Sequence, residues 1–198
     1  MRNELKFVFC LIATLCPIAY GQTISVDGYL KQARAFVDLR RYNEAEREYI
    51  NANIQAEKLG PRNPTMIAVL DEFANFYVSQ GNWAKAEPLF QRELNLRTSL
   101  SGDRCPEVAQ CKKQFAEMYI SEGRYNEAET LLQEALQYWQ DVVDQGLNNP
   151  RANTSKDRLV MADCLDDLAK IYRQTNRYDQ AKQTEQKSLT IRQNPSEF

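Results

Sequence analysis

The sequence contains no histidine and little glycine, proline or cysteine. Its 198 residues include 7 glycines, 7 prolines and 5 cysteines. The absence of histidine removes the commonest metal ligand and the commonest general base. The formal net charge is −2, with acidic and basic residues mixed along the chain, so no basic excess favours binding to nucleic acid or anionic lipid.

Motifs for catalysis or cofactor binding are also absent. The sequence has no zinc-ligand spacing, no glycine-rich phosphate loop, no nucleophile elbow and no EF-hand pattern. Adjacent carboxylates, such as Asp71 with Glu72, would point to different sides of a helix, so solvated helix faces are a better interpretation than acid–base pairs. We therefore expect no enzyme activity, no metal and no cofactor.

One apolar run occurs, from Phe7 to Ala19, and it follows Arg2 and Lys6. It is shorter than the ~20 apolar residues that a membrane-spanning helix needs. Small residues, Ala19 and Gly21, stand where a signal peptidase cleaves. We predict a signal peptide at residues 1–21, an exported protein (periplasmic or secreted) and no membrane span after cleavage. A buried N-terminal helix and an uncleaved anchor are the alternatives.

A seven-residue segment recurs four times along the rest of the chain. The copies run from Arg40 to Glu46, Gly81 to Glu87, Gly123 to Glu129 and Asn176 to Lys182. Their aromatic residues, Tyr42, Trp83, Tyr125 and Tyr178, are 41, 42 and 53 residues apart. A period in this range indicates a solenoid, in which each unit buries its apolar face against its neighbours.

Apolar residues between these segments recur at steps of three and four, which predicts helices. The expected architecture is all-α, with one domain over residues 22–194 and four hairpins at about 25–60, 65–101, 106–144 and 156–193. The second helices are expected at Glu44–Lys58, Lys85–Ser99, Glu127–Val143 and Gln180–Gln193.

Local chemistry predicts where these helices begin and end. Asn43 with Glu46, and Asn126 with Glu129, match capping boxes. Left-handed residues that end the first helices are expected at Gly81, Gly123 and Asn176. Arg40 adopts that conformation less easily than glycine, so we expect the first turn to differ.

Small and large residues alternate at the positions where paired helices would touch. Alanine would let the helix axes approach, and the aromatic ring of each recurring segment would fill the adjoining gap. The structural set is Ala33, Tyr42, Ala45, Ala74, Trp83, Ala86, Ala116, Tyr125, Ala128, Ala169, Tyr178 and Ala181.

These residues resemble the pattern of tetratricopeptide repeats (TPR). The 42-residue spacing is similar to that of the kinesin-light-chain type, whose Leu-Gly-x-x-His-Pro connector corresponds to Leu59–Pro64, with Asn63 in place of histidine. The resemblance covers about residues 25–194. It implies a right-handed α-solenoid of about four TPR helix hairpins.

In that family the first helix of each repeat lines a concave groove that holds a peptide. Carried over residue by residue, the groove positions are Leu30, Lys31, Arg34, Asp71, Glu72, Asn75, Lys113, Gln114, Glu117, Asp166, Asp167 and Lys170. The four aspartates and glutamates at 71, 72, 166 and 167 would repel an anion. We expect a protein or peptide partner of basic or mixed charge.

Two parts of the chain depart from the repeat. The longer third spacing places an exposed loop at Asp144–Asp157, which contains a glycosylation sequon at Asn153. In the last second helix, Glu185 stands where the earlier ones have Tyr49, Phe90 and Leu132, which suits a polar terminal face.

Three cysteines follow the predicted leader, too few for a disulfide framework. Cys111 and Cys164 occupy the same place in two repeats, and small buried residues are a better interpretation than a bridge. Cys105 is the stronger candidate for a free or paired thiol.

The sequence favours a non-catalytic module that binds a peptide or protein segment in the concave groove. The alternative is a structural or assembly subunit that packs into a larger envelope complex through its convex face or its ends.

Overall fold

The computed structural model describes residues 25–60, 62–146 and 155–193. Within these ranges the secondary structure consists of eight helices and contains no strand. They are α2 (Val26–Asp38), α3 (Tyr42–Lys58), α4 (Pro64–Ser79), α5 (Trp83–Ser101), α6 (Pro106–Glu122), α7 (Tyr125–Gly146), α8 (Ser155–Gln174) and α9 (Tyr178–Gln193). The predicted signal peptide and Asn153 lie outside the described residues.

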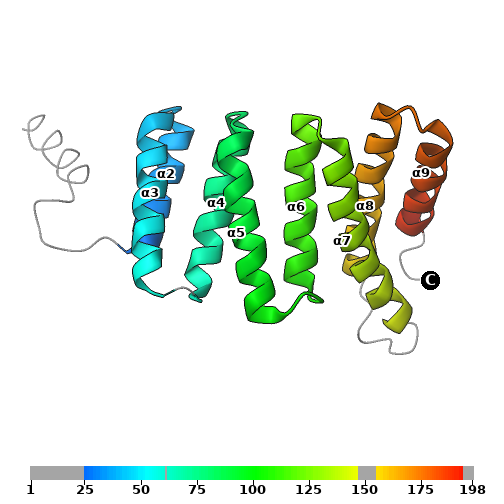
Figure 1. Ribbon diagram of the computed structural model, residues 1–198, viewed down its shortest axis with the longest axis horizontal. Coiled ribbons are helices and arrows are strands. Elements are labelled where there is room, and N and C mark those ends of the chain that lie inside the picture. The colour runs from blue at the N-terminus through cyan, green and yellow to red at the C-terminus, as the bar shows by residue number, and fades with distance from the viewer. Residues whose placement is uncertain (1–24, 61, 147–154, 194–198) are drawn as a thin grey trace, which may run out of the picture. The chain divides into compact units, whose positions relative to one another are not determined.

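The chain divides into two compact units, with the boundary inside α4 between Val69 and Leu70. In the first unit α2 packs against α3. In the second unit α6 packs against α7 and α8 against α9, while α5 with α6 and α7 with α8 join consecutive hairpins. Figure 1 shows α5 to α9 following one another in chain order.

The four turns inside the hairpins share one backbone geometry. The backbone N–H of Arg41 donates to the carbonyl of Phe36 at 2.8 Å, and Asn82, Arg124 and Arg177 each donate to the carbonyl five residues earlier at 2.7–2.9 Å. The residue before each donor is left-handed, at Arg40, Gly81, Gly123 and Asn176. This is the C-terminal cap in which one positive-φ residue lets the chain reverse. Arg40 takes φ 57°, so the expectation that the first turn would differ was wrong.

The second helices begin at the aromatic residue, two positions earlier than predicted. Arg41 is the N-cap of α3 and makes no side-chain capping bond. Its guanidinium instead bonds Glu44 at 2.8 Å. Asn43 and Asn126 lie within the first helical turns of α3 and α7, so the predicted capping boxes do not start these helices. Arg41, three residues before Glu44, therefore provides a hydrogen-bond donor for this acidic side chain in the first turn of α3.

All eight alanines of the structural set are buried, with 3% or less of their surface exposed. The aromatic residues of the same set are not core residues: Tyr178 is 64% exposed and Tyr42 is 38% exposed. The prediction that these rings fill the gap beside the alanines was therefore wrong for both. The buried rings come six residues earlier, at Phe36, Tyr77, Tyr119 and Tyr172.

The region between the third and fourth hairpins is more helical than predicted. α7 continues through Gly146 and α8 begins at Ser155. The ends of the predicted loop, residues 144–146 and 155–157, are therefore helical, and the remaining residues 147–154 lie outside the described ranges.

Candidate protein-binding surface

Nine of the predicted groove residues lie on three first helices of the second unit, and we call this set the first-helix face. Its members are Asp71, Glu72 and Asn75 on α4, Lys113, Gln114 and Glu117 on α6, and Asp166, Asp167 and Lys170 on α8. The other predicted positions, Leu30, Lys31 and Arg34, lie on α2 in the first unit. Leu30 is buried there, so it was wrongly assigned to an accessible surface, whereas Lys31 and Arg34 are exposed.

Asp71 joins α4 to α6 on this face. Its carboxylate accepts a hydrogen bond from the Asn75 amide at 2.8 Å and a longer one from the Gln114 amide at 3.4 Å. Desolvation raises the pKa of Asp71, against the opposing effect of the positive charge of Arg97. Asp71 is therefore half-buried and connects α4 to α6, in addition to being an acidic group on the face.

Lys113 and Asp167 make the corresponding connection between α6 and α8. The Lys113 ammonium lies 3.4 Å from one oxygen of Asp167, and Lys170 donates to the other at 2.7 Å. Lys113 also contacts Glu117. Burial alone would lower the pKa of Lys113, but its bond to Glu117 and the charges of Glu117 and Asp167 outweigh that effect and raise it. Because Asp167 is only 6% exposed, it holds the helices together and is not open to a partner.

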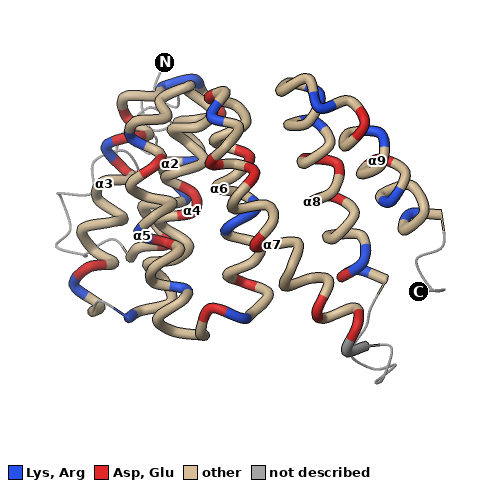
Figure 2. Tube along the Cα trace, turned by 45° about the vertical axis from the view of Figure 1, so that its right-hand side comes forward, with Lys and Arg blue, Asp and Glu red and all other residues tan. Residues whose placement is uncertain are grey.

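Three members of the face remain exposed, and they occupy the same place in successive repeats. Asn75, Glu117 and Lys170 are separated by 42 and 53 residues and are each exposed. They present an amide, an acid and a base in order along the second unit. Figure 2 shows acidic and basic residues interspersed over these helices. The accessible part of the face is thus of mixed charge.

The sequence analysis missed a charged cluster beside the face. Arg192 of α9 donates to Asp163 and to Asp166, each at 2.6 Å. The two acceptors are three residues apart on α8 and so lie on one side of that helix. The acidic charge that we assigned to Asp166 is therefore paired within the chain. Nothing in the local sequence relates Arg192 to residues 26 and 29 positions away.

Arginines at the hairpin turns form a second set of contacts that the sequence analysis missed. Arg124 lies 4.2 Å from the Tyr119 ring centre and bonds Glu87 on α5 at 2.8 Å. The Tyr119 hydroxyl donates to the same carboxylate at 2.7 Å. These bonds lower the pKa of Glu87. The repeated spacing of five residues from a buried ring to an arginine was the available sequence signal, and its role is structural.

The candidate metal ligands and nucleophiles of the described residues form no reactive site. Across the described ranges, no group of three or more Cys, Asp or Glu side chains is placed to hold a metal. Glu93 is fully buried and bonds Arg97 at 2.7 Å, and desolvation raises its pKa. Burial raises the pKa of both Cys111 and Cys164 to about 12, so neither thiol is an activated nucleophile.

In the part of the chain that the structure describes, no helix has the length and apolar character to cross a bilayer.

Two family models described as tetratricopeptide repeat match residues 65–141 and 161–194, which together exceed half of the chain. The chain belongs to the tetratricopeptide repeat family. It is an all-α TPR solenoid, as predicted. Proteins with this fold act in protein–protein interaction or as scaffolds, and the family is generally non-catalytic. No curated protein matches the sequence.

Solved structures with this fold include BtubC (BKLC) from P. vanneervenii, with TM-score 0.73, 15% identity and 87% of this chain covered. The TPR chain spans 65% of the length of that protein. MamA is similar over 88% of this chain and 82% of its own, with TM-score 0.60 and 13% identity. A putative kinesin light chain from Podosopora anserina is similar over 84% of this chain and 93% of its own, with TM-score 0.50 and 16% identity. At these identities the likeness shows a shared fold alone.

Proposed function

We propose that this TPR protein is a non-catalytic binding module whose first-helix face holds a peptide segment of a partner protein. The observation that carries the proposal is two sets of polar contacts, one from Asn75 through Asp71 to Gln114 and the other from Lys113 through Asp167 to Lys170. These contacts fix three helices side by side. A preorganised surface loses little conformational entropy when a segment binds to it.

The exposed residues define the chemistry of the segment. Asn75, Glu117 and Lys170 each make a contact within the chain, with Asp71, Lys113 and Asp167, but all three side chains are exposed. On their exposed sides, Glu117 would pair with a basic side chain of the partner, Lys170 with an acidic one, and Asn75 would bond the backbone or a polar group. Packed helices lie ~8–10 Å apart, and an extended chain advances ~3.4 Å per residue. Successive first helices would therefore contact about every third residue of an extended partner. The partner segment expected from these contacts carries both acidic and basic residues.

A charge-exchange variant tests this proposal. The full chain and the double variant Glu117→Lys/Lys170→Glu would be used to capture partners from the native source, with quantitative mass spectrometry of what is retained. We expect the variant to lose at least tenfold of the specific partner, because both charges are reversed at unchanged net charge.

The matched control is Asp179→Lys/Lys182→Glu, which exchanges charges on exposed residues of α9, away from this face. The control should retain the partner. Equal retention by wild type and the Glu117/Lys170 variant would contradict the proposal, as would selective loss in the control.

We also propose that the protein is exported, on the basis of the charged start, the apolar run and the small residues before Gln22. N-terminal sequencing of the protein from its native source tests this directly. A mature chain that starts at Gln22 is expected, and a chain that retains Phe7 would contradict cleavage.

A further inference from the structure

Two grooves lie at equivalent places in the third and fourth repeats, on the side of the second helices. The first, of about 590 Å³, includes Lys112 of α6 with Glu134 and Tyr138 of α7. The second, of about 820 Å³, lies between α7, α8 and α9 and includes Leu165, Lys187 and Ile191. Each of these three residues follows its counterpart in the first groove by 53 positions. The two grooves are therefore the same feature of the repeat.

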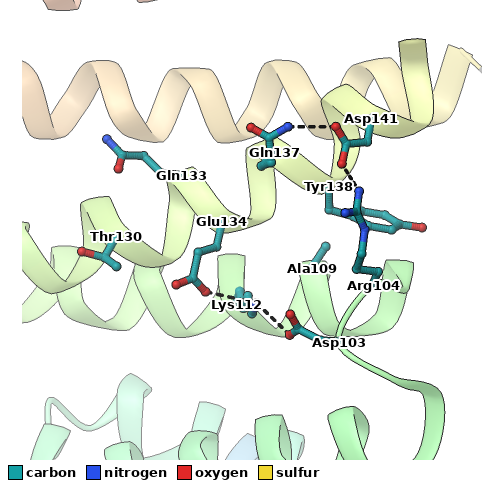
Figure 3. Close-up of a pocket in the computed structure, with 10 residues that line it drawn as sticks. All are labelled: Asp103, Arg104, Ala109, Lys112, Thr130, Gln133, Glu134, Gln137, Tyr138 and Asp141. Atoms are coloured by element: carbon teal, nitrogen blue, oxygen red, sulfur yellow. Dashed lines mark hydrogen bonds and ion pairs between the residues drawn. The ribbon is translucent and has the colours of Figure 1, made fainter. Parts of the chain in front are cut away.

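The first groove is closed by ion pairs. The Lys112 ammonium lies 3.1 Å from Asp103 and 3.1 Å from Glu134. Arg104 pairs with Asp141 near its other end. Figure 3 shows these pairs crossing the space between the helices. The charged groups in this groove satisfy one another, so the site offers little to a partner.

The second groove has an apolar floor in place of these ion pairs. Leu136 and Val143 of α7, Met161 and Leu165 of α8 and Ile191 of α9 line it. Since the equivalent groove is polar, the repeat fold does not require an apolar lining here. The floor residues other than Leu136 are largely buried, so the groove accepts inserted side chains and does not enclose a whole ligand.

The charge around the second groove indicates what would bind. Lys187 stands where the first groove has Glu134, is exposed, and makes no ion pair with any residue of the described ranges. Arg158 also lines the groove but is only 6% exposed, and Asp144, the only acid among the described lining residues, accepts a hydrogen bond from Gln140 at 3.0 Å. The other polar lining residues, Gln140, Gln183, Gln186 and Thr190, are uncharged. The groove therefore has an apolar floor, and Lys187 is the exposed base beside it.

We propose that this groove docks a short amphipathic helix of a partner protein, with apolar side chains inserted between α7 and α9 and an acidic residue against Lys187. The floor runs from Leu136 to Val143 along α7, which is about two helical turns at ~1.5 Å per residue. The helix would present apolar residues at positions i, i+3 or i+4, and i+7, as helices bound in grooves do. This surface is separate from the first-helix face.

The test uses a fluorescein-labelled 14-residue helical peptide with leucine at i, i+3 and i+7 and glutamate flanking that face. A second peptide carries lysine in place of each glutamate. Fluorescence anisotropy against the full chain measures both affinities. We expect the glutamate peptide to bind at least tenfold more tightly than the lysine peptide.

Lys187→Glu places at this site the residue type of the first groove, where Glu134 is equivalent. This variant should reverse the preference between the two peptides. Glu134→Lys is the matched control in the first groove and should change neither affinity. Leu165→Lys should abolish binding of both peptides, with circular dichroism reporting whether the variant remains folded. Because Lys187 is exposed, its substitution keeps the test valid even if Leu165→Lys unfolds.

Three results would overturn the proposal. The first is no anisotropy change with either peptide up to about millimolar protein. The second is loss of binding in Glu117→Lys/Lys170→Glu with Lys187→Glu unaffected, which would place the peptide on the first-helix face. The third is a wild-type dimer in light scattering that Leu165→Lys dissociates, because the groove would then be occupied by a second copy of this chain.

Discussion

Arg177 donates two hydrogen bonds to Glu129, at 3.0 Å to one carboxylate oxygen and 2.6 Å to the other. Arg177 lies at the turn between α8 and α9, and Glu129 lies on α7 of the preceding hairpin. The guanidinium also lies 4.4 Å from the centre of the Tyr172 ring. Arg124 makes the equivalent contacts with Glu87 and Tyr119 one repeat earlier. The turn arginines thus link successive hairpins of the second unit.

Replacing Glu129 with Gln should destabilise the protein by about 1 kcal/mol. A bidentate charged bond would contribute more in a dry interior, but a third of the Arg177 side chain is exposed and solvent screens the pair. Urea denaturation followed by circular dichroism measures the change. Lys182→Gln is the control, because Lys182 occupies the equivalent position in the last repeat and is exposed. Equal stability of the two variants would contradict a role for this pair.

The buried ring and the exposed ring of the last turn should respond very differently to truncation. Tyr172→Ala should cost about 3 kcal/mol, since it empties a buried site beneath Arg177. Tyr178→Ala should change the free energy of unfolding by less than about 0.5 kcal/mol, since that side chain is mostly exposed. Thermal melts of both variants measure the contrast, and similar losses would show that Tyr178 packs after all.

Enlarging a contact alanine should strain the third hairpin. Ala128 has no exposed surface, and leucine there should cost about 1–3 kcal/mol by overpacking. Ala84→Leu, on an exposed position of α5, should leave the thermal midpoint nearly unchanged. A melt of Ala128→Leu that coincides with wild type would count against close helix approach at this site.

The stability of the protein should carry a pH dependence from Glu93. Desolvation raises the pKa of Glu93 above its ordinary value of 4.5, in spite of its bond with Arg97. Between the unfolded and the folded pKa, the native state holds a proton that the unfolded state has lost, so the free energy of unfolding falls as pH rises through that window. The contribution is complete below about pH 4.5 and is lost above the folded pKa.

The Glu93→Gln variant isolates this contribution. The advantage of wild type over Glu93→Gln in urea denaturation should be larger at about pH 4.5 than at pH 7. Glu87→Gln should show the opposite trend, because the bond from Arg124 lowers the pKa of Glu87 and its contribution is lost on acidification. A difference between wild type and Glu93→Gln that does not change with pH would rule out the assigned shift.

The three cysteines of the described ranges should differ in reactivity. Cys111 and Cys164 are buried and burial raises the pKa of each thiol to about 12, whereas Cys105 is partly exposed. Maleimide at neutral pH should therefore label Cys105 in the native chain and the other two only after denaturation. Peptide mapping by mass spectrometry locates the labels. Native labelling at Cys111 would show that its helix opens readily.

The family and the all-α class could be predicted from the sequence because they depend on local chemistry. A segment such as Gly123–Glu129 combines a left-handed residue, a helix start and a contact alanine within seven positions. Its recurrence four times indicates a stack of hairpins whatever the neighbouring residues are. The helix starts were predicted two residues too late. The same local sequence is compatible with a side-chain cap at Asn43 and with a pair between Arg41 and Glu44, and the structure has the pair.

The sequence by itself determined the repeat, its turns and the family, and the tertiary structure decided which side chains are accessible. Asp167 and Lys170 were predicted alike, yet Asp167 is covered by Lys113 from another helix, while Lys170 is exposed. Equivalent positions also diverge, since Lys112 closes one groove and Leu165 leaves the next apolar. Burial and pairing depend on residues distant in the sequence, such as Lys113 and Asp167, 54 positions apart, and Arg192 and Asp166, 26 positions apart. Periodic patterns carry no information about those partners.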